Sequence, residues 1–199
     1  MAPVNVDPRN IREFKDAQAF YTWLGKHHRN QDEVWIKIHK VASGLKSITP
    51  KEAIDVALCW GWIDAVRKAF DDRSFLQRYT PRGRKSIWSA INVDNVNRLI
   101  KEGRMTEHGL RQVEAAKADG RWARAYNGGR NMKIPADLQA AIDAEPKARA
   151  MLDKLNAQNR FALAFRTNNM KTAVGRKRKI EAFVDMLKRG ETIHPQTVK

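Results

Sequence analysis

Hydrophobic residues recur along this chain with two different periods, and each period predicts a kind of element. In residues 14–28 they fall at every third or fourth position, which predicts an amphipathic helix. In residues 33–40 they alternate with polar residues, which predicts a strand. We expect an apolar face on this strand, formed by Val34, Ile36 and Ile38. We expect a second face that meets water, formed by Trp35, Lys37 and His39.

The next element is a helix with a well-defined start. Thr49 and Glu52 have the spacing of a capping box, and Pro50 suits the first position of a helix. The helix should run to Gly61 and be buried, because it is apolar on most of its sides.

Two further strands complete a small sheet. Residues 62–70 and 75–80 have strand-like composition, and residues 71–74 suit the loop of a hairpin. With the first strand they predict a small antiparallel sheet within residues 33–80.

The remainder of the chain predicts helices only. The expected ranges are residues 93–103, 106–120, 135–144, 146–155, 159–165 and 172–189. We place a boundary at Asn127-Gly128-Gly129, with an α+β region in residues 1–127 and a C-terminal helical module in residues 132–194, packed together as one compact unit. The predicted fold class is therefore α+β, predominantly helical.

Charge narrows the range of partners. The chain of 199 residues has 38 Lys and Arg against 22 Asp and Glu, a formal net charge of +16. Such an excess favours polyanions, whether nucleic acid, an anionic membrane surface or phosphorylated ligands. A basic soluble protein without a dedicated polyanion partner has the same composition.

A single cysteine limits the redox chemistry. Cys59 excludes an intrachain disulfide and a cysteine-based zinc cluster, and its neighbours Leu58 and Trp60 indicate a buried thiol. Residues 1–7 lack the pattern of a leader peptide, and no apolar run reaches the roughly 18 residues of a membrane span. We therefore expect a cytoplasmic location.

The segment 78–89, RYTPRGRKSIWS, is the strongest candidate for a binding site. Its cations Arg78, Arg82 and Lys85 suit an anion, and a carboxylate or phosphate would also meet backbone N–H groups at the start of the following helix. Trp88 would then stack on a planar group. The alternative is an exposed edge strand protected by charge, with Trp88 filling the junction between sheet and helix.

Asp64 is the second candidate. An acid between aromatic and aliphatic strand residues can have a raised pKa and serve as a general base. The alternative is a structural ion pair with Arg67, Arg78 or Arg82. If the partner is Arg78 and the pair lines a cleft, the two would form the polar floor of a binding pocket.

A basic run near the C-terminal end is the third candidate. Arg176, Lys177, Arg178 and Lys179 would contact phosphates in a nucleic-acid-binding protein. At 100° per residue, however, these cations are spread around the helix, which is also typical of a solvated surface.

The sequence contains no metal or cofactor motif that would support an enzymatic function. The five histidines show no His-x-x-x-His spacing, so the sequence predicts no metal site. Phosphate loops, dinucleotide fingerprints and nucleophile elbows do not occur, so it predicts no cofactor.

Several motifs resemble one family. They are LCWGWID (58–64), LQRYTPR (76–82), Lys85-Ser86, Trp88-Ser89, Asn92, GRMT (103–106) and AAKADGRW (115–122). They resemble the YdeI/OmpD-associated family, also called bacteriocin-protection proteins, and the resemblance extends through a helical module at about residues 135–191. Two positions differ from the family pattern. Ala65 replaces a Gly, and Val174-Gly175 replaces a Glu-Thr pair, which removes a natural cap before the basic helix.

The resemblance implies fold and relatives rather than a reaction, because the family supplies no catalytic residues to carry over. Its name implies association with an outer-membrane porin and protection against bactericidal peptides. We expect a cytoplasmic, non-catalytic binding protein acting in stress resistance. Its ligand would be an anionic or phosphate-bearing small molecule, held by the residues Asp64, Arg78, Arg82, Lys85 and Trp88. The alternatives are a sequence-nonspecific nucleic-acid-associated protein and, more weakly, an enzyme with Asp64 as general base. The sequence leaves the oligomeric state open.

Overall fold

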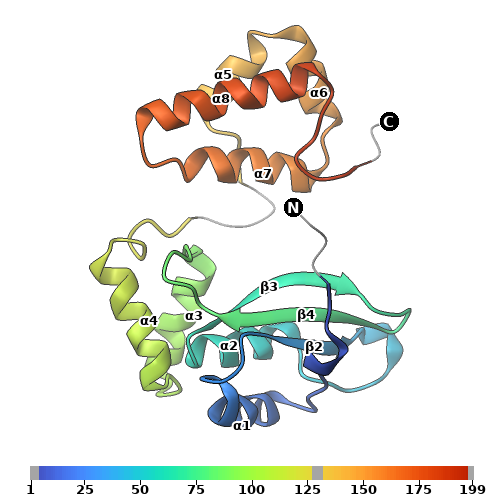
Figure 1. Ribbon diagram of the computed structural model, residues 1–199, viewed down its shortest axis with the longest axis vertical. Helices are drawn as coiled ribbons and strands as arrows, with labels where there is room; N and C mark the ends of the chain where they lie inside the picture. Colours follow the sequence, from blue (N-terminus) through green and yellow to red (C-terminus); the bar gives the residue numbers. More distant parts are fainter. Residues whose placement is uncertain (1–4, 127–131, 197–199) are drawn as a thin grey trace. The chain divides into compact units, whose positions relative to one another are not determined.

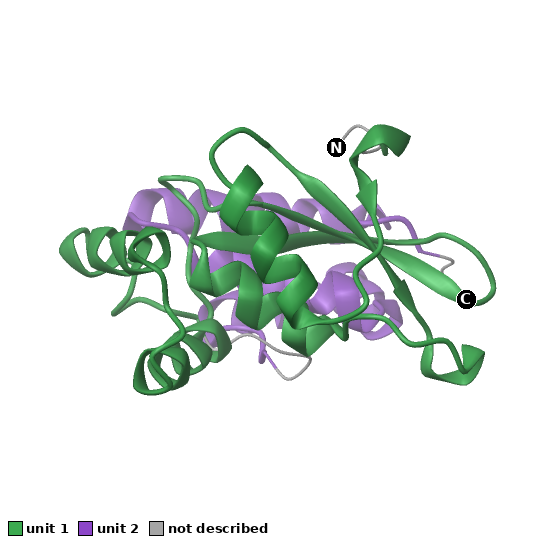
Figure 2. Cartoon of the chain, turned by 90° about the horizontal axis from the view of Figure 1, so that it is seen from below, with its two compact units in different colours: residues 1–126 green, residues 127–199 purple. Residues whose placement is uncertain are grey.

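The computed structural model describes residues 5–126 and 132–196 of the chain (Figure 1). The chain divides into two compact units, unit 1 with residues 1–126 and unit 2 with residues 127–199 (Figure 2). Unit 1 combines a sheet with helices, and unit 2 is helical, so the predicted α+β class is confirmed. In the described residues, no helix is both long enough and apolar enough to span a membrane.

Unit 1 contains four strands, four α-helices and two short 3-10 helices among its described residues. In chain order they are η1 (Pro8–Asn10), β1 (Ile11–Arg12), α1 (Ala17–His27), β2 (Val34–His39), η2 (Val41–Ser43), α2 (Pro50–Cys59), β3 (Trp62–Ala69), β4 (Ser74–Pro81), α3 (Ala90–Lys101) and α4 (Glu107–Ala118). The described part of unit 2 consists of α5 (Ala136–Asp143), α6 (Pro146–Lys154), α7 (Ala157–Asn168) and α8 (Ala173–Lys188).

The sheet has the strand order β1-β2-β4-β3. The hairpin of β3 and β4 is antiparallel as predicted, and β4 also pairs antiparallel with β2. The prediction of a wholly antiparallel sheet within residues 33–80 is wrong in one respect, because the two-residue strand β1 adds a parallel neighbour to β2. Since β4 lies between two strands, the interpretation of its basic end as an exposed edge strand is also wrong.

Helices α1 and α2 cover one face of the sheet (Figure 1). The predicted apolar face of β2 lies beneath them, with the buried side chains Val34, Ile36 and Ile38. The prediction for Trp35 is wrong, because this residue is fully buried and its indole Nε1 donates to Glu33 Oε1 at 3.2 Å. Glu33 also accepts from Arg78 on β4 at 2.6 Å, so the Trp35 indole takes part in a polar network between strands that the alternation does not reveal.

Side-chain caps explain where several helices begin. The predicted capping box is present, with Thr49 N donating to Glu52 Oε2 at 2.8 Å and Glu52 N to Thr49 Oγ1 at 3.3 Å. Helix α8 starts although Val174-Gly175 replaces a capping pair, because Thr172 Oγ1 accepts from Gly175 N at 3.1 Å. The cap is therefore supplied by a neighbouring residue.

Unit 2 buries its own hydrophobic core. Helices α5, α6, α7 and α8 contribute Leu138, Ile142, Leu152, Leu163, Phe183 and Leu187, among others. Helix α8 falls within the range 172–189 that the sequence predicts for the last helix.

The end of α2 and the start of α4 meet at a close contact. The carbonyl oxygen of Cys59 accepts from both Thr106 N at 3.1 Å and Thr106 Oγ1 at 2.6 Å. Gly109 allows this approach, since a Cβ atom there would lie 2.4 Å from the Cys59 oxygen. The Cys59 thiol is buried as predicted, and burial raises its pKa to about 11.

A methyl group at this contact should destabilise unit 1. We expect Gly109→Ala to lower the free energy of unfolding by roughly 1–3 kcal/mol, because backbone atoms must move apart to admit the Cβ atom. Denaturation followed by tryptophan fluorescence measures unit 1 selectively, since all six Trp lie in it.

Gly25→Ala in α1 is the matched control. Its Cβ atom would lie at an ordinary 3.5 Å from the Trp60 ring, so we expect a gain of about 0.5–1 kcal/mol from helix propensity. Equal effects of the two substitutions would show that the contact between α2 and α4 is not tight.

Candidate functional site

The segment 78–89 is held between the sheet and α3 by residues that follow α4. Arg121 Nη1 donates to Ser86 O at 2.9 Å, and Tyr126 N donates to Trp88 O at 3.0 Å. Ser89 caps α3 by accepting from Asn92 N at 3.2 Å. The segment is therefore a fixed part of unit 1 and not an open turn.

Arg82 is the buried centre of this segment, with 4% of its surface exposed. Its guanidinium carbon lies 3.6 Å from the centre of the Trp88 ring. The backbone N–H donates to Gly61 O at 3.0 Å, and Nη1 donates to Ile87 O at 3.1 Å. Nε and Nη2, which form the second edge of the guanidinium, have no hydrogen-bond partner. Both nitrogens are buried, as the Trp88 ring is, so a carboxylate or phosphate would pair with this edge through two parallel hydrogen bonds only when unit 1 opens around it.

Trp88 does not present an open surface for a ligand. Only 2% of the residue is exposed, and its ring packs against Trp122 with 4.8 Å between the ring centres. The planar group that it stacks on is the Arg82 guanidinium. The alternative interpretation from the sequence, in which Trp88 fills the junction between sheet and helix, describes its position correctly. Its indole Nε1 is nevertheless buried without a partner.

In the structure Arg121, and not the predicted Arg78 or Lys85, is the neighbouring cation of Arg82. Burial, followed by the charge of Arg121, lowers the pKa of Arg82 to about 10. Asp64 and Tyr126 act in the opposite direction with smaller effects. Sequence reasoning assigned no role to Arg121, although it lies within the AAKADGRW motif. Its position beside Arg82 depends on the fold of residues 121–126 against the segment 78–89.

Asp64 lies beside Tyr79 in the pairing of β3 with β4. Burial raises the pKa of its carboxyl group above the ordinary value, while its own backbone N–H and the charges of Arg82 and Arg67 oppose that effect. Tyr79 is fully buried, and its hydroxyl group has no hydrogen-bond partner. The raised pKa has the direction expected of a general base, whereas the structural ion pair with Arg67, Arg78 or Arg82 that the sequence also allowed would lower it.

Arg78 points to the opposite face of the sheet, because neighbouring residues of a strand alternate and Tyr79 pairs with Asp64. Its Nε donates to Glu33 Oε2 at 2.6 Å, and Glu33 also accepts from Asn10 Nδ2 at 3.1 Å. Asp64 and Arg78 therefore do not form the floor of one pocket. Sequence reasoning missed Glu33, because its pairing with Arg78 spans 45 residues.

The remaining predicted cations lie apart from Arg82. Lys85 and the neighbouring Arg84 are exposed. In α8, Arg176 is bound by Asp137 through contacts of 2.6 and 2.9 Å, and Lys179 lies over the Phe183 ring. Lys177 and Arg178 are exposed. The structure thus leaves two of the four α8 cations free of such contacts.

The residues that the structure describes form no candidate metal site. No group of three or more His, Cys, Asp or Glu residues is placed there to hold an ion. His28 and His108 do lie together, with 4.1 Å between ring centres, but they form a pair beside Trp60.

Comparison with known families divides the chain at the same place as its fold. Residues 12–112 match the family described as "Domain of unknown function (DUF8412)". Residues 131–190 match the family described as "Bacteriocin-protection, YdeI or OmpD-Associated". The predicted resemblance to the second family is confirmed for the C-terminal module, whereas the motifs at 58–106 lie in the region of the first. No curated protein and no solved structure matches the chain.

The raised pKa of Asp64 predicts how the stability of the folded protein changes with pH. Because the folded state holds the proton more tightly than the unfolded state, unfolding becomes easier as pH rises from the ordinary pKa through the raised one. We expect Asp64→Asn to remove this loss, so that the variant gains stability relative to the wild type between about pH 3 and pH 7.

Chemical denaturation across this pH range, with carboxyl NMR titration of Asp64, measures the effect. Asp119→Asn is the matched control, since hydrogen bonds from Arg121 lower the pKa of Asp119 and the sign of the pH effect is reversed. An Asp64 pKa at or below the ordinary value of 3.8 would contradict the prediction and remove the support for a general base.

Proposed function

The chain belongs to the DUF8412 family and carries a YdeI/OmpD-associated module, and from this premise we propose that it is a cytoplasmic, non-catalytic binding protein. Unit 1 binds a small anion, through a carboxylate or phosphate group, at the free edge of Arg82. The description "bacteriocin-protection" for the module supports a role in stress resistance.

One observation carries this proposal: two guanidinium nitrogens of a buried arginine lack partners. Each buried donor left without a hydrogen bond costs about 1–3 kcal/mol, and more when it is charged. Proteins seldom retain such a cost in their interior, and sites of function are where it is retained. An oxyanion at Nε and Nη2 would remove the cost by accepting two charge-assisted hydrogen bonds.

The surroundings of Arg82 favour an anion over a cation or a neutral ligand. The charge of Arg121, which is paired with Asp119 at 2.7 Å, has a larger effect on the Arg82 pKa than the opposing charge of Asp64. Trp88 holds the guanidinium plane from one side, so the orientation of the free edge is fixed before a ligand arrives. A fixed, desolvated cation binds an anion more strongly than a mobile surface lysine does.

Anions should therefore stabilise unit 1 through Arg82. At constant ionic strength, we expect phosphate and acetate to raise the melting temperature above that in chloride, because they bind the folded state only. Arg82→Met should abolish the increase, and Arg82→Lys should retain only part of it, since an ammonium group offers no paired edge.

Arg84→Met is the matched control, because it removes the same charge two residues away at an exposed position. We expect it to behave as the wild type. An equal loss of the anion effect in both variants would show that net charge, and not the Arg82 edge, is responsible.

Arg82→Met also tests the energetic argument when no ligand is present. In a buffer free of oxyanions, we expect Arg82→Met to lower the free energy of unfolding by no more than about 1 kcal/mol, because the two unpaired donors offset the hydrogen bond to Ile87 and the contact with the Trp88 ring. A large loss of stability would show that Arg82 is held by interactions that compensate its burial, and the proposal would fail.

Nucleic-acid binding stays a prediction that rests on the net charge of +16. It can be separated from anion binding by fluorescence anisotropy of labelled oligonucleotides at about 50 and 200 mM salt, where phosphate contacts weaken steeply. If the anion proposal is right, Lys177→Ala/Arg178→Ala will leave the phosphate effect on stability unchanged. Tight oligonucleotide binding at low salt that this double variant removes would favour the nucleic-acid alternative.

A further inference from the structure

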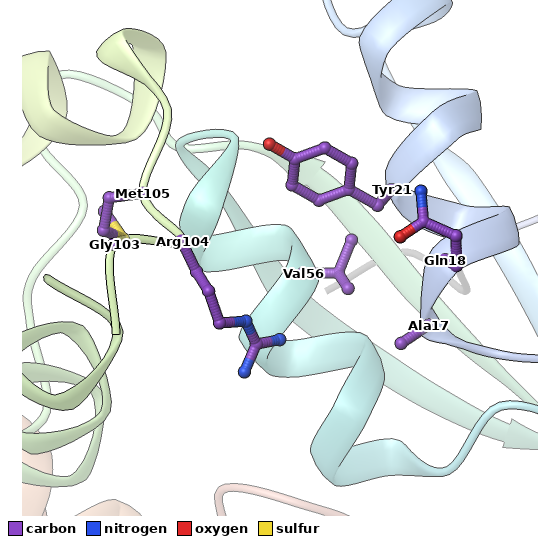
Figure 3. A pocket seen from close by; sticks show the side chains of 7 residues that line it. All are labelled: Ala17, Gln18, Tyr21, Val56, Gly103, Arg104 and Met105. Atoms are coloured by element: carbon purple, nitrogen blue, oxygen red, sulfur yellow. The ribbon is translucent and has the colours of Figure 1, made fainter. Parts of the chain in front are cut away.

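A second hollow lies in unit 1, between α1, α2 and the linker that joins α3 to α4 (Figure 3). Its volume is about 260 Å³. The lining residues are Ala17, Gln18, Tyr21, Val56, Gly103, Arg104 and Met105. None of them belongs to the surroundings of Arg82 described above, so this pocket is independent of the proposed function.

Apolar groups line part of the pocket. Val56 forms the floor from α2, and Ala17 and the Tyr21 ring line it from α1 (Figure 3). Tyr21 is held in place by an edge contact with Trp60, with 5.3 Å between ring centres. A flat hydrocarbon group would therefore meet a fixed aromatic ring and a buried aliphatic floor.

Arg104 supplies the charge on the linker side of the pocket. Its Nη1 donates to Glu102 Oε2 at 2.9 Å, which fixes the guanidinium group and leaves Nε and Nη2 without a hydrogen bond to any described residue. Glu102 also accepts from Arg98 at 3.0 Å, and Arg98 binds the buried Asp55 at 2.7 Å. The two acids and the two arginines of this network balance in charge, and the Nε and Nη2 edge of Arg104 remains available to a carboxylate.

Two further polar atoms lie at the pocket. Gln18 uses its amide nitrogen to bond Thr22 Oγ1 at 3.3 Å, so its carbonyl oxygen is unpaired among the described residues. The Tyr21 hydroxyl group likewise has no hydrogen bond there and points toward the linker (Figure 3). A ligand could accept from Tyr21 in addition to Arg104, whereas an ammonium group would meet the charge of Arg104.

We propose that this pocket is a second binding site, for a small monocarboxylic acid with a flat apolar body and no amino group. The carboxylate binds the Nε and Nη2 edge of Arg104, and the apolar body lies over Val56 against the Tyr21 ring. The volume is slightly below the range of pockets for drug-sized molecules, which limits the ligand to about the size of a single or fused ring acid.

Benzoate is a suitable probe, and benzamide is its neutral analogue. NMR titration that follows the Val56 methyl signals should show saturable binding of benzoate by the wild type. We expect benzamide to bind at least about tenfold more weakly, because it lacks the charge that Arg104 pairs with. Arg104→Met should weaken the binding of benzoate by a similar factor. The variant should keep the wild-type melting temperature, because the Arg104 side chain is exposed.

Two variants make the result specific to the pocket. Ala17→Phe should block both compounds by filling the hollow, and Arg82→Met should leave the Val56 titration unchanged. The proposal is overturned if benzoate leaves the Val56 signals unmoved, or if Arg104→Met or Ala17→Phe binds benzoate as the wild type does. Loss of benzoate binding in Arg82→Met alone would also overturn it and would assign the acid to the Arg82 site.

Discussion

The carbonyl oxygen of Cys59, shared by the amide and hydroxyl groups of Thr106, fixes the relation between the sheet and the helices of unit 1. It joins the C-terminal end of α2 to the N-terminal end of α4, where the partial charges of the two helix ends are opposite. Two residues later, Gly61 O accepts from Arg82 N and so ties the end of β4 to the same place. Both proposed sites lie next to this junction, because Arg104 precedes Thr106 and Arg82 N donates to Gly61 O.

The two proposed sites use one chemical device in different settings. Nη1 of Arg82 donates to Ile87 O, and Nη1 of Arg104 donates to Glu102 Oε2. This bond orients the guanidinium plane and leaves the opposite edge for a ligand. At Arg82 the group is buried, so an absent ligand costs stability, whereas Arg104 stays partly hydrated and costs little. The buried site should thus discriminate more sharply between anions than the exposed one.

Local patterns made most of the elements predictable, because periodicity and caps act within a few residues. The capping box of Thr49 and Glu52 and the hairpin of β3 and β4 are of this kind. The prediction failed where a distant partner decides the outcome. Strand β1 has only two residues, too few for a periodic signal, and exists because β2 offers its free edge. Trp35 is buried although it alternates with lysine and histidine, and its indole donates to Glu33, which also accepts from Arg78 on β4.

The candidate sites likewise combine features that a local pattern predicts with features that a distant partner decides. A cluster of cations in residues 78–89 drew attention to Arg82, but only the register of β3 with β4 separates Arg78 from Asp64. Three segments far apart in sequence form the pocket at Arg104, and no local motif marks such a place. The contact of Glu33 with Arg78 likewise follows from the pairing of β2 with β4.

The single thiol of the chain lies on the same residue whose carbonyl oxygen holds the junction. With a pKa of about 11, roughly one molecule in ten thousand carries a thiolate at pH 7, and the side chain is almost completely covered. Alkylating reagents and peroxides therefore reach Cys59 only when the packing of α2 against α3 and α4 opens. The rate at which Cys59 is modified therefore measures how often unit 1 opens. A cysteine introduced on the surface can be labelled selectively while Cys59 stays in place.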